Sequence, residues 1–290
     1  MPNRSGILDE IYNLGEAQDQ VRRSYLAKLA EHTNRDVIIY AAQFSSEGPA
    51  WPIELKDVQA FMSAFHDMGN DKLDLILHSP GGYLEAADQI VNYIRSKYNH
   101  VRAIIPQNAM SASTMIACSA NTIIMGKHSA LGPTDPQING VSAHAILEEF
   151  ERAKSEIQEN PETAPLWVAK IANWPPGFLD MCRREIELSE KKVSQWLNEY
   201  MFNGRKPNPA ESIAKWLADA PQHRTHGRPL GIDLLKSKGL HMKALEADQE
   251  MQDLVLSVFH STMITFEVSN CVKLVENHKG KAMYFHSAQK

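Results

Sequence analysis

Cysteine is scarce in this 290-residue sequence, and long apolar runs are missing from it. The three cysteines, Cys118, Cys182 and Cys271, lie far apart without metal-binding spacing, so we expect neither a disulfide framework nor a metal site. No stretch approaches the roughly 20 apolar residues that a membrane-spanning helix needs. The first residues, Met-Pro-Asn-Arg-Ser, lack the apolar segment of a secretory signal. We therefore expect a cytoplasmic protein without a membrane span.

Basic residues are also fewer than acidic ones: the sequence has 30 Lys and Arg residues and 35 Asp and Glu residues, which gives a formal net charge of -5. A protein that binds nucleic acid usually carries a basic patch or stripe, and this sequence shows none. Hydrophobic residues make up 43% and charged residues 22%, as in ordinary globular proteins. The composition therefore argues against nucleic acid as a partner.

The first half of the chain alternates between short apolar runs and amphipathic segments. The apolar runs predict strands at 36–42, 73–78, 101–105 and 122–125, and the amphipathic periodicity predicts helices at 6–33, 54–68, 84–97 and 111–120. Alternation of strands and helices predicts βαβ units and a mostly parallel sheet.

After residue 140 the apolar positions recur at helical spacing. This pattern predicts helices at 142–159, 162–173, 176–187, 189–203, 208–219 and 248–276. We expect an N-terminal helix within residues 1–34, an α/β core over 35–140, and a helical region over 141–290. The last region is expected to pack on the core and complete the functional site.

A Gly-Gly pair, Gly81 and Gly82, follows the predicted strand 73–78 and precedes the helix 84–97. Without Cβ atoms, backbone N–H groups at this turn can approach a ligand closely near a helix N-terminus. A tight strand-to-helix turn with no further role would have the same sequence.

Ser111 begins the next predicted helix and is flanked by small residues. A hydroxyl at a helix start lies near the positive end of the helix dipole, which favours a developing negative charge. An ordinary N-cap serine is the alternative interpretation. The spacing favours a functional serine over an ordinary N-cap, since the 29 residues from Gly82 to Ser111 fit one helix, one strand and two turns. A right-handed crossover then brings both strand ends to one edge of the sheet, where N–H groups of Gly82 and Ala112 can form an oxyanion hole beside Ser111.

Three sequence blocks in this order resemble the serine dehydrogenase proteinase family. They are Ser-Pro-Gly-Gly at 79–82, Ala-Met-Ser-Ala-Ser-Thr-Met-Ile-Ala at 109–117, and Leu-Gly-Pro-Thr-Asp-Pro-Gln at 131–137. That family belongs to the Clp-like serine proteases related to signal peptide peptidase A. The resemblance continues as far as Val-Glu-Asn-His-Lys-Gly at 275–280.

The resemblance implies a Clp/crotonase-like core of ββα units that uses Ser111 as the nucleophile and Gly82 and Ala112 as backbone donors. It also implies a homo-oligomer that acts on peptide or protein substrates, and we expect no cofactor. In its Clp form the triad would need a histidine near residue 134, but this sequence has Thr134 and Asp135 there. Asp135 is therefore a candidate for orienting the base rather than for being the base.

Two residues are candidates for the general base, and the sequence does not decide between them. Lys154 lies on the first helix after the Gly-Pro turn, where relatives with a Ser-Lys dyad carry their lysine. A lysine serves as a base only when burial or nearby positive charge lowers its pKa, and Glu151 and Glu156 would act in the opposite direction. His226, close to where Clp-type proteases carry the third member of their triad, titrates near neutral pH without special arrangement.

The sequence favours a serine peptidase, and two other functions stay open. A crotonase-type enzyme acting on an acyl-CoA would use the same pair of backbone donors without a serine nucleophile. A catalytically inactive scaffold or binding protein would keep the fold while Ser111 lies far from both Lys154 and His226.

Overall fold

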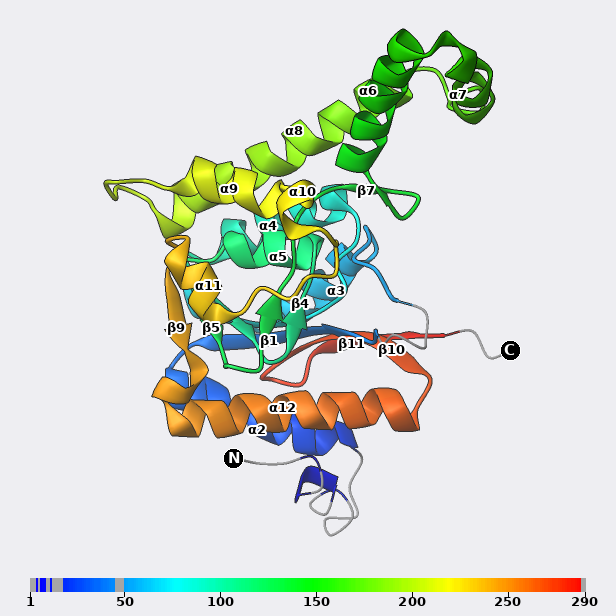
Figure 1. The fold of residues 1–290 in the computed structure, drawn as a ribbon. Coiled ribbons are helices and arrows are strands. Elements are labelled where there is room, and N and C mark those ends of the chain that lie inside the picture. Colours follow the sequence, from blue (N-terminus) through cyan, green and yellow to red (C-terminus); the bar gives the residue numbers. More distant parts are fainter. Residues whose placement is uncertain (1–3, 5, 9–10, 12–17, 45–49, 288–290) are drawn as a thin grey trace.

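A seven-stranded sheet forms the centre of the computed structural model, which describes residues 4, 6–8, 11, 18–44 and 50–287 (Figure 1). The strands lie in the order β11-β10-β1-β2-β3-β5-β9. Neighbours from β1 to β9 are parallel, whereas β10 and β11 pair antiparallel. The strands are β1 (Asp36–Ala42), β2 (Lys72–His78), β3 (His100–Ile105), β5 (Thr122–Met125), β9 (Met242–Ala244), β10 (Cys271–Asn277) and β11 (Ala282–His286). The predicted α/β class with a mostly parallel sheet is confirmed.

Helices cover both faces of this sheet (Figure 1). On one face lie α3 (Asp57–Ala64), α4 (Leu84–Lys97) and α5 (Ala112–Cys118), and on the other lie α2 (Gln18–Thr33) and α12 (Gln249–Val268). Successive residues of β1 point to opposite faces of the sheet. Ile38 packs in the core beneath α3, α4 and α5, and Ile39 packs in the core beneath α2 and α12. Double coverage explains why β1 is a continuous apolar run instead of an alternating one. The part of the predicted helix 6–33 before Gln18 falls largely outside the described residues.

An arm of helices extends away from the sheet (Figure 1). It consists of α6 (Ala143–Glu159), the 3₁₀ turn Pro161–Thr163, α7 (Ala164–Ile171) and the outer part of α8 (Phe178–Trp196). The chain returns through the π turn Leu197–Met201, α9 (Ala210–Ala218), α10 (Ala220–His223), α11 (Ile232–Ser237) and the 3₁₀ turn Leu245–Ala247. The helices predicted at 176–187 and 189–203 are thus one helix with a π turn at its end.

The predicted helix 248–276 is wrong in its last part. Helix α12 ends at Val268, and β10 enters the sheet beside β1. Lys273 and Glu276 look like surface residues of an amphipathic helix, yet both are fully buried in β10. Because β9, β10 and β11 also belong to the central sheet, the region 141–290 is helical only in part.

Four two-residue strands in the described chain lie beside the site instead of in the main sheet. They are β4 (Asn108–Ala109) paired with β6 (Ala130–Leu131), and β7 (Gln137–Ile138) paired with β8 (Val141–Ser142). These pairs fix the segments that carry the second and third sequence blocks, and a single bridge from Ser79 to Ala109 joins the first block to them.

Candidate active site

Ser111 occupies a sharp turn between β4 and α5. Its backbone has φ 51° and ψ −121°, a conformation that residues with a side chain rarely adopt. Its hydroxyl makes no capping hydrogen bond to the helix, so the interpretation as an ordinary N-cap serine does not hold. Strained backbone of this kind is concentrated at functional sites, where the surrounding structure holds it in place.

Hydrogen bonds around Thr114 hold this turn. The Thr114 hydroxyl donates to the carbonyl of Ala109 at 2.7 Å and accepts from the N–H of Gly132 at 3.0 Å. The first turn of α5 is thereby tied both to β4 and to the Gly-Pro turn. The position of Ser111 therefore depends on two segments of chain besides its own.

The Gly-Gly turn lies directly against Ser111. Ser79 donates from its N–H to Asn108 at 3.1 Å and accepts from the N–H of Met110 at 3.0 Å, which aligns the end of β2 with β4. A Cβ atom added to Gly81 would lie 2.6 Å from the Cβ of Ser111. The Gly-Gly turn therefore approaches Ser111 closely, and only a residue without a side chain fits at Gly81.

Gly82 is enclosed by the backbone of Ile53. The N–H of Ile53 donates to Gly81 at 2.7 Å, and its carbonyl accepts from the N–H of Tyr83 at 3.0 Å. Within the described chain the N–H groups of Gly82 and Ala112 find no acceptor. Both remain free to bind a carbonyl oxygen, which is the property that an oxyanion hole requires.

His226 forms a hydrogen-bonded pair with Asp135. The Nδ1–H of His226 donates to Oδ1 of Asp135 at 2.8 Å, and Nε2 of Gln137 donates to Oδ2 at 2.7 Å. An ionised carboxylate only accepts, so it selects the tautomer of His226 with the proton on Nδ1 and a free lone pair on Nε2. Asp135 is 2% exposed, while the side chain of His226 is 31% exposed. The aspartate thus lies behind the histidine.

A backbone bridge brings these two distant residues together. Leu131 and Leu230 exchange two hydrogen bonds of 3.1 and 2.8 Å, which join the segment before Asp135 to the segment after His226. The N–H of Thr134 also donates to the carbonyl of Leu217 in α9 at 2.8 Å. Contacts with the chain after residue 140 therefore hold the segments of Asp135 and His226 in place.

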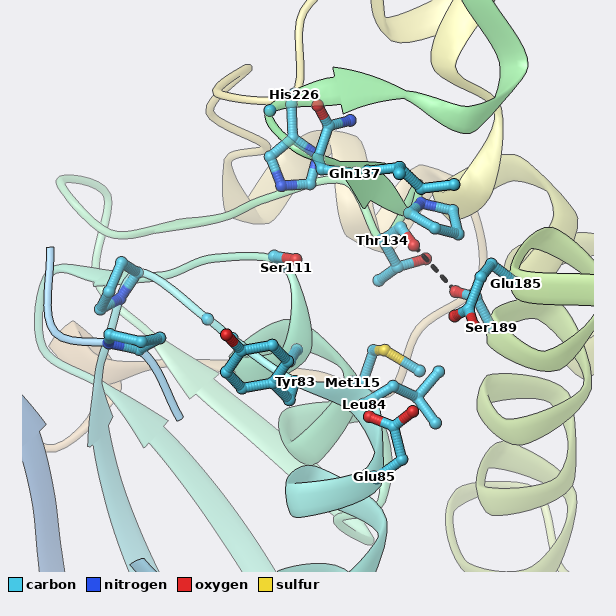
Figure 2. Close-up of a pocket in the computed structure, with 18 of the residues that line it drawn as sticks. Tyr83, Leu84, Glu85, Ser111, Met115, Thr134, Gln137, Glu185, Ser189 and His226 are labelled. Carbon is cyan, nitrogen blue, oxygen red and sulfur yellow. Dashed lines mark hydrogen bonds between the residues drawn. The ribbon is translucent and has the colours of Figure 1, made fainter. Parts of the chain in front are cut away.

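Ser111 and His226 line one cavity of about 840 Å³ (Figure 2). Gly81, Gly82 and Ala112 line it as well. No hydrogen bond joins the Ser111 hydroxyl to the His226 imidazole in this structure. The cavity brings together a hydroxyl, an imidazole with a free lone pair, and two unbound N–H groups, which is the set of groups that acyl transfer needs.

Lys154 does not lie in this cavity. It belongs to α6 in the arm, its side chain is 53% exposed, and its Nζ pairs with Glu151 at 2.7 Å. This exposed position beside a carboxylate lacks both the burial and the nearby positive charge that would make a lysine a base. Within one subunit, Lys154 is thus neither close to Ser111 nor in a suitable environment for a base.

The roles of several cavity residues could not be inferred from the sequence. Gln137 follows Asp135 by two residues, and only the contact shows that it holds the carboxylate. Glu85 and Glu185 also line the cavity, although each is part of an amphipathic helix that predicts a solvated face. Among the described residues, no group of three or more His, Cys, Asp or Glu side chains could hold a metal ion. None of the described helices has the length and apolar character of a membrane span.

Comparisons with known proteins identify the family of this chain. A family model described as ClpP-like SDH-type serine proteinase matches residues 49–274. Two uncharacterized proteins of Methanocaldococcus jannaschii are similar: MJ0137 is 29% identical over 76% of this chain, and MJ1495 is 30% identical over 66%. The chain spans 72% of the first relative and 59% of the second. A mutant ClpP1 from Listeria monocytogenes has 12% identity and a TM-score of 0.42, covering 77% of this chain and 99% of that one.

Proposed function

Because the chain belongs to the family of ClpP-like SDH-type serine proteinases, we propose that it hydrolyses peptide bonds through an acyl-enzyme on Ser111. In this proposal His226 is the general base and Asp135 orients it. The observation that carries the proposal is the 2.8 Å bond from His226 to buried Asp135 at the cavity that also holds Ser111.

In the first step Nε2 of His226 takes the proton from the Ser111 hydroxyl while the oxygen attacks the scissile carbonyl. The carbonyl oxygen becomes an oxyanion that accepts hydrogen bonds from Gly82 and Ala112. His226 then gives the proton to the leaving amine, and the acyl-enzyme forms. Water, deprotonated by the same imidazole, attacks the ester and releases the acid. Asp135 stays ionised throughout and stabilises the imidazolium.

The order of these residues along the chain is serine, aspartate, histidine. The Clp-type order of the resemblance places histidine before aspartate, so this chain exchanges the two positions. Catalysis depends on the spatial arrangement and not on chain order, and unrelated hydrolases use several orders. The exchange therefore preserves each role.

The missing hydrogen bond between Ser111 and His226 is compatible with this mechanism. Catalytic hydrogen bonds are often long or misaligned without substrate and tighten in the complex. The hydrogen bond from His226 to Asp135 does not depend on substrate, and it is already formed.

A fluorophosphonate probe tests the proposal directly, because it reacts covalently with an activated serine. We expect labelling of the wild-type protein, none in Ser111→Ala, and labelling at least about 100-fold slower in His226→Ala. Lys154→Ala is the matched control for loss of a candidate base and is expected to label at the wild-type rate. Absence of labelling in the folded wild-type protein would refute an active serine and favour the inactive scaffold. Loss of labelling in Lys154→Ala, with labelling kept in His226→Ala, would instead identify Lys154 of another subunit as the base.

The homo-oligomer is also part of this proposal. At the outer end of the arm, α7 exposes Leu166 by 76% and Val168 by 62%. Large apolar side chains gathered at a protruding end are typical of contacts between subunits. Light scattering on the purified protein tests this, and a monomeric mass at micromolar concentration would overturn it.

A further inference from the structure

Two carboxylates share the cavity of Ser111. Glu85 lies in the first turn of α4, three residues after Gly82, and Glu185 lies on α8 across the cavity (Figure 2). Burial raises the pKa of Glu185, and the negative charge of Glu85 raises that pKa further. Both carboxylates line the same cavity, so their negative charges act on the same space.

Neither carboxylate has a cation to neutralise it. In the ranges that the structure describes, no ion pair or side-chain hydrogen bond reaches the carboxylate of Glu85 or of Glu185. Cations in this region are paired with other acids, since Lys192 binds Asp88 at 2.7 Å and Arg183 binds Asp180 at 2.8 Å. The negative charge of the cavity is left for a ligand to satisfy.

An unpaired hydroxyl and an apolar wall complete this part of the cavity. Thr134 is 3% exposed, lines the cavity, and its hydroxyl has no hydrogen-bond partner. Buried polar groups without partners are uncommon and indicate a missing donor or acceptor. Leu84, Met115 and Met181 line the same cavity, and such side chains suit the aliphatic stem of a long cationic side chain.

We propose that this part of the cavity binds the side chain of Lys or Arg in a peptide substrate. The residue concerned is the one whose carbonyl lies in the oxyanion hole, because Glu85 follows Gly82 by only one turn of chain and Met115 follows Ser111 by one helical turn. The inference rests on the proposed peptidase function and names its substrate class as peptides cleaved after a basic residue. An acidic side chain at this position would meet two like charges and be rejected.

Peptidyl diphenyl phosphonates test this preference without requiring turnover, since the serine oxygen attacks their phosphorus and expels phenoxide, and they carry a chosen side chain at the critical position. We expect the second-order labelling rate constant to be at least about tenfold higher for Arg or Lys than for norleucine, and lowest for Glu. Equal rates for Arg and norleucine would overturn the inference.

Charge variants locate the preference within the cavity. Glu185→Gln and Glu85→Gln should each lower the Arg-to-norleucine rate ratio, and the double variant should bring it close to one. Glu187→Gln is the matched control, because Glu187 lies on the same helix, is exposed and does not line the cavity. An unchanged ratio in the double variant would refute the role of these carboxylates.

The general fluorophosphonate separates the two proposals. Labelling at Ser111 by that probe without a basic preference among the phosphonates refutes only the inference. Failure of the general probe refutes the peptidase function as well.

Discussion

Replacing Lys273 by Met should cost the protein a large part of its stability. The Lys273 side chain is fully buried, and its Nζ lies 2.9 Å from both carboxylate oxygens of Asp57 and 2.6 Å from the carbonyl of Pro52. Asp57 is equally buried and also accepts from the Tyr40 hydroxyl at 2.8 Å and the N–H of Glu54 at 3.0 Å. Without the ammonium, a buried negative charge would keep only two neutral donors.

Removal of one partner from a buried ion pair costs about 3–5 kcal/mol of unfolding free energy. Methionine nearly matches the length of lysine, so the loss of packing adds little, and the figure measures the uncompensated charge of Asp57. Adding Asp57→Asn removes that charge as well. The double variant should therefore recover most of the loss, because replacing a whole buried pair is often close to neutral.

Urea unfolding followed by circular dichroism measures both effects as a double-mutant cycle. Lys72→Met is the control, because Lys72 is an exposed lysine in the neighbouring part of the sheet and should change stability by less than about 0.5 kcal/mol. A loss below about 1 kcal/mol in Lys273→Met would refute the reasoning. So would a double variant whose loss equals the sum of the two single losses.

The remaining predictions concern the site and its pH dependence. Gly82→Ala places a Cβ 2.3 Å from the backbone nitrogen of Ile53, so both the melting temperature and kcat should fall, the latter by about 100-fold or more in a peptide assay. Asp135→Asn should reduce kcat by about 10⁴-fold because the wrong tautomer of His226 becomes favoured, and near wild-type turnover would contradict the assigned role. Burial lowers the pKa of His78 from 6.5 to about 4. The unfolded chain therefore takes up a proton that the folded chain refuses, and unfolding free energy should fall by about 3 kcal/mol as the pH drops from 6.5 to 4. Denaturant titrations across this range should show the fall, and His78→Gln should flatten it.

Much of the core could be predicted because its signals are local. The strands 36–42 and 122–125 match β1 and β5, since both are continuous apolar runs bounded by polar residues. The Gly82-to-Ser111 spacing placed both residues at one edge of the sheet because a right-handed crossover allows little else. The structure has Gly81 in direct contact with Ser111.

The parts that the sequence did not indicate depend on contacts between distant segments. Glu276 in β10 accepts from Arg22 in α2 at 2.6 Å, and a partner 254 positions away leaves no local pattern. The choice between Lys154 and His226 has the same origin. Each has a plausible position along the chain, but only the bridge from Leu131 to Leu230 places His226 beside Asp135.

The backbone of Ser111 has a thermodynamic consequence. A residue with a side chain at φ 51° stores about 1–3 kcal/mol that glycine would largely release. Ser111→Gly should therefore fold more stably than the wild-type protein while losing its nucleophile. At Ser111 the chain gives up stability and keeps a nucleophilic hydroxyl at the cavity. A rise in melting temperature on removal of Ser111 would be a measurable sign that the residue serves chemistry instead of folding.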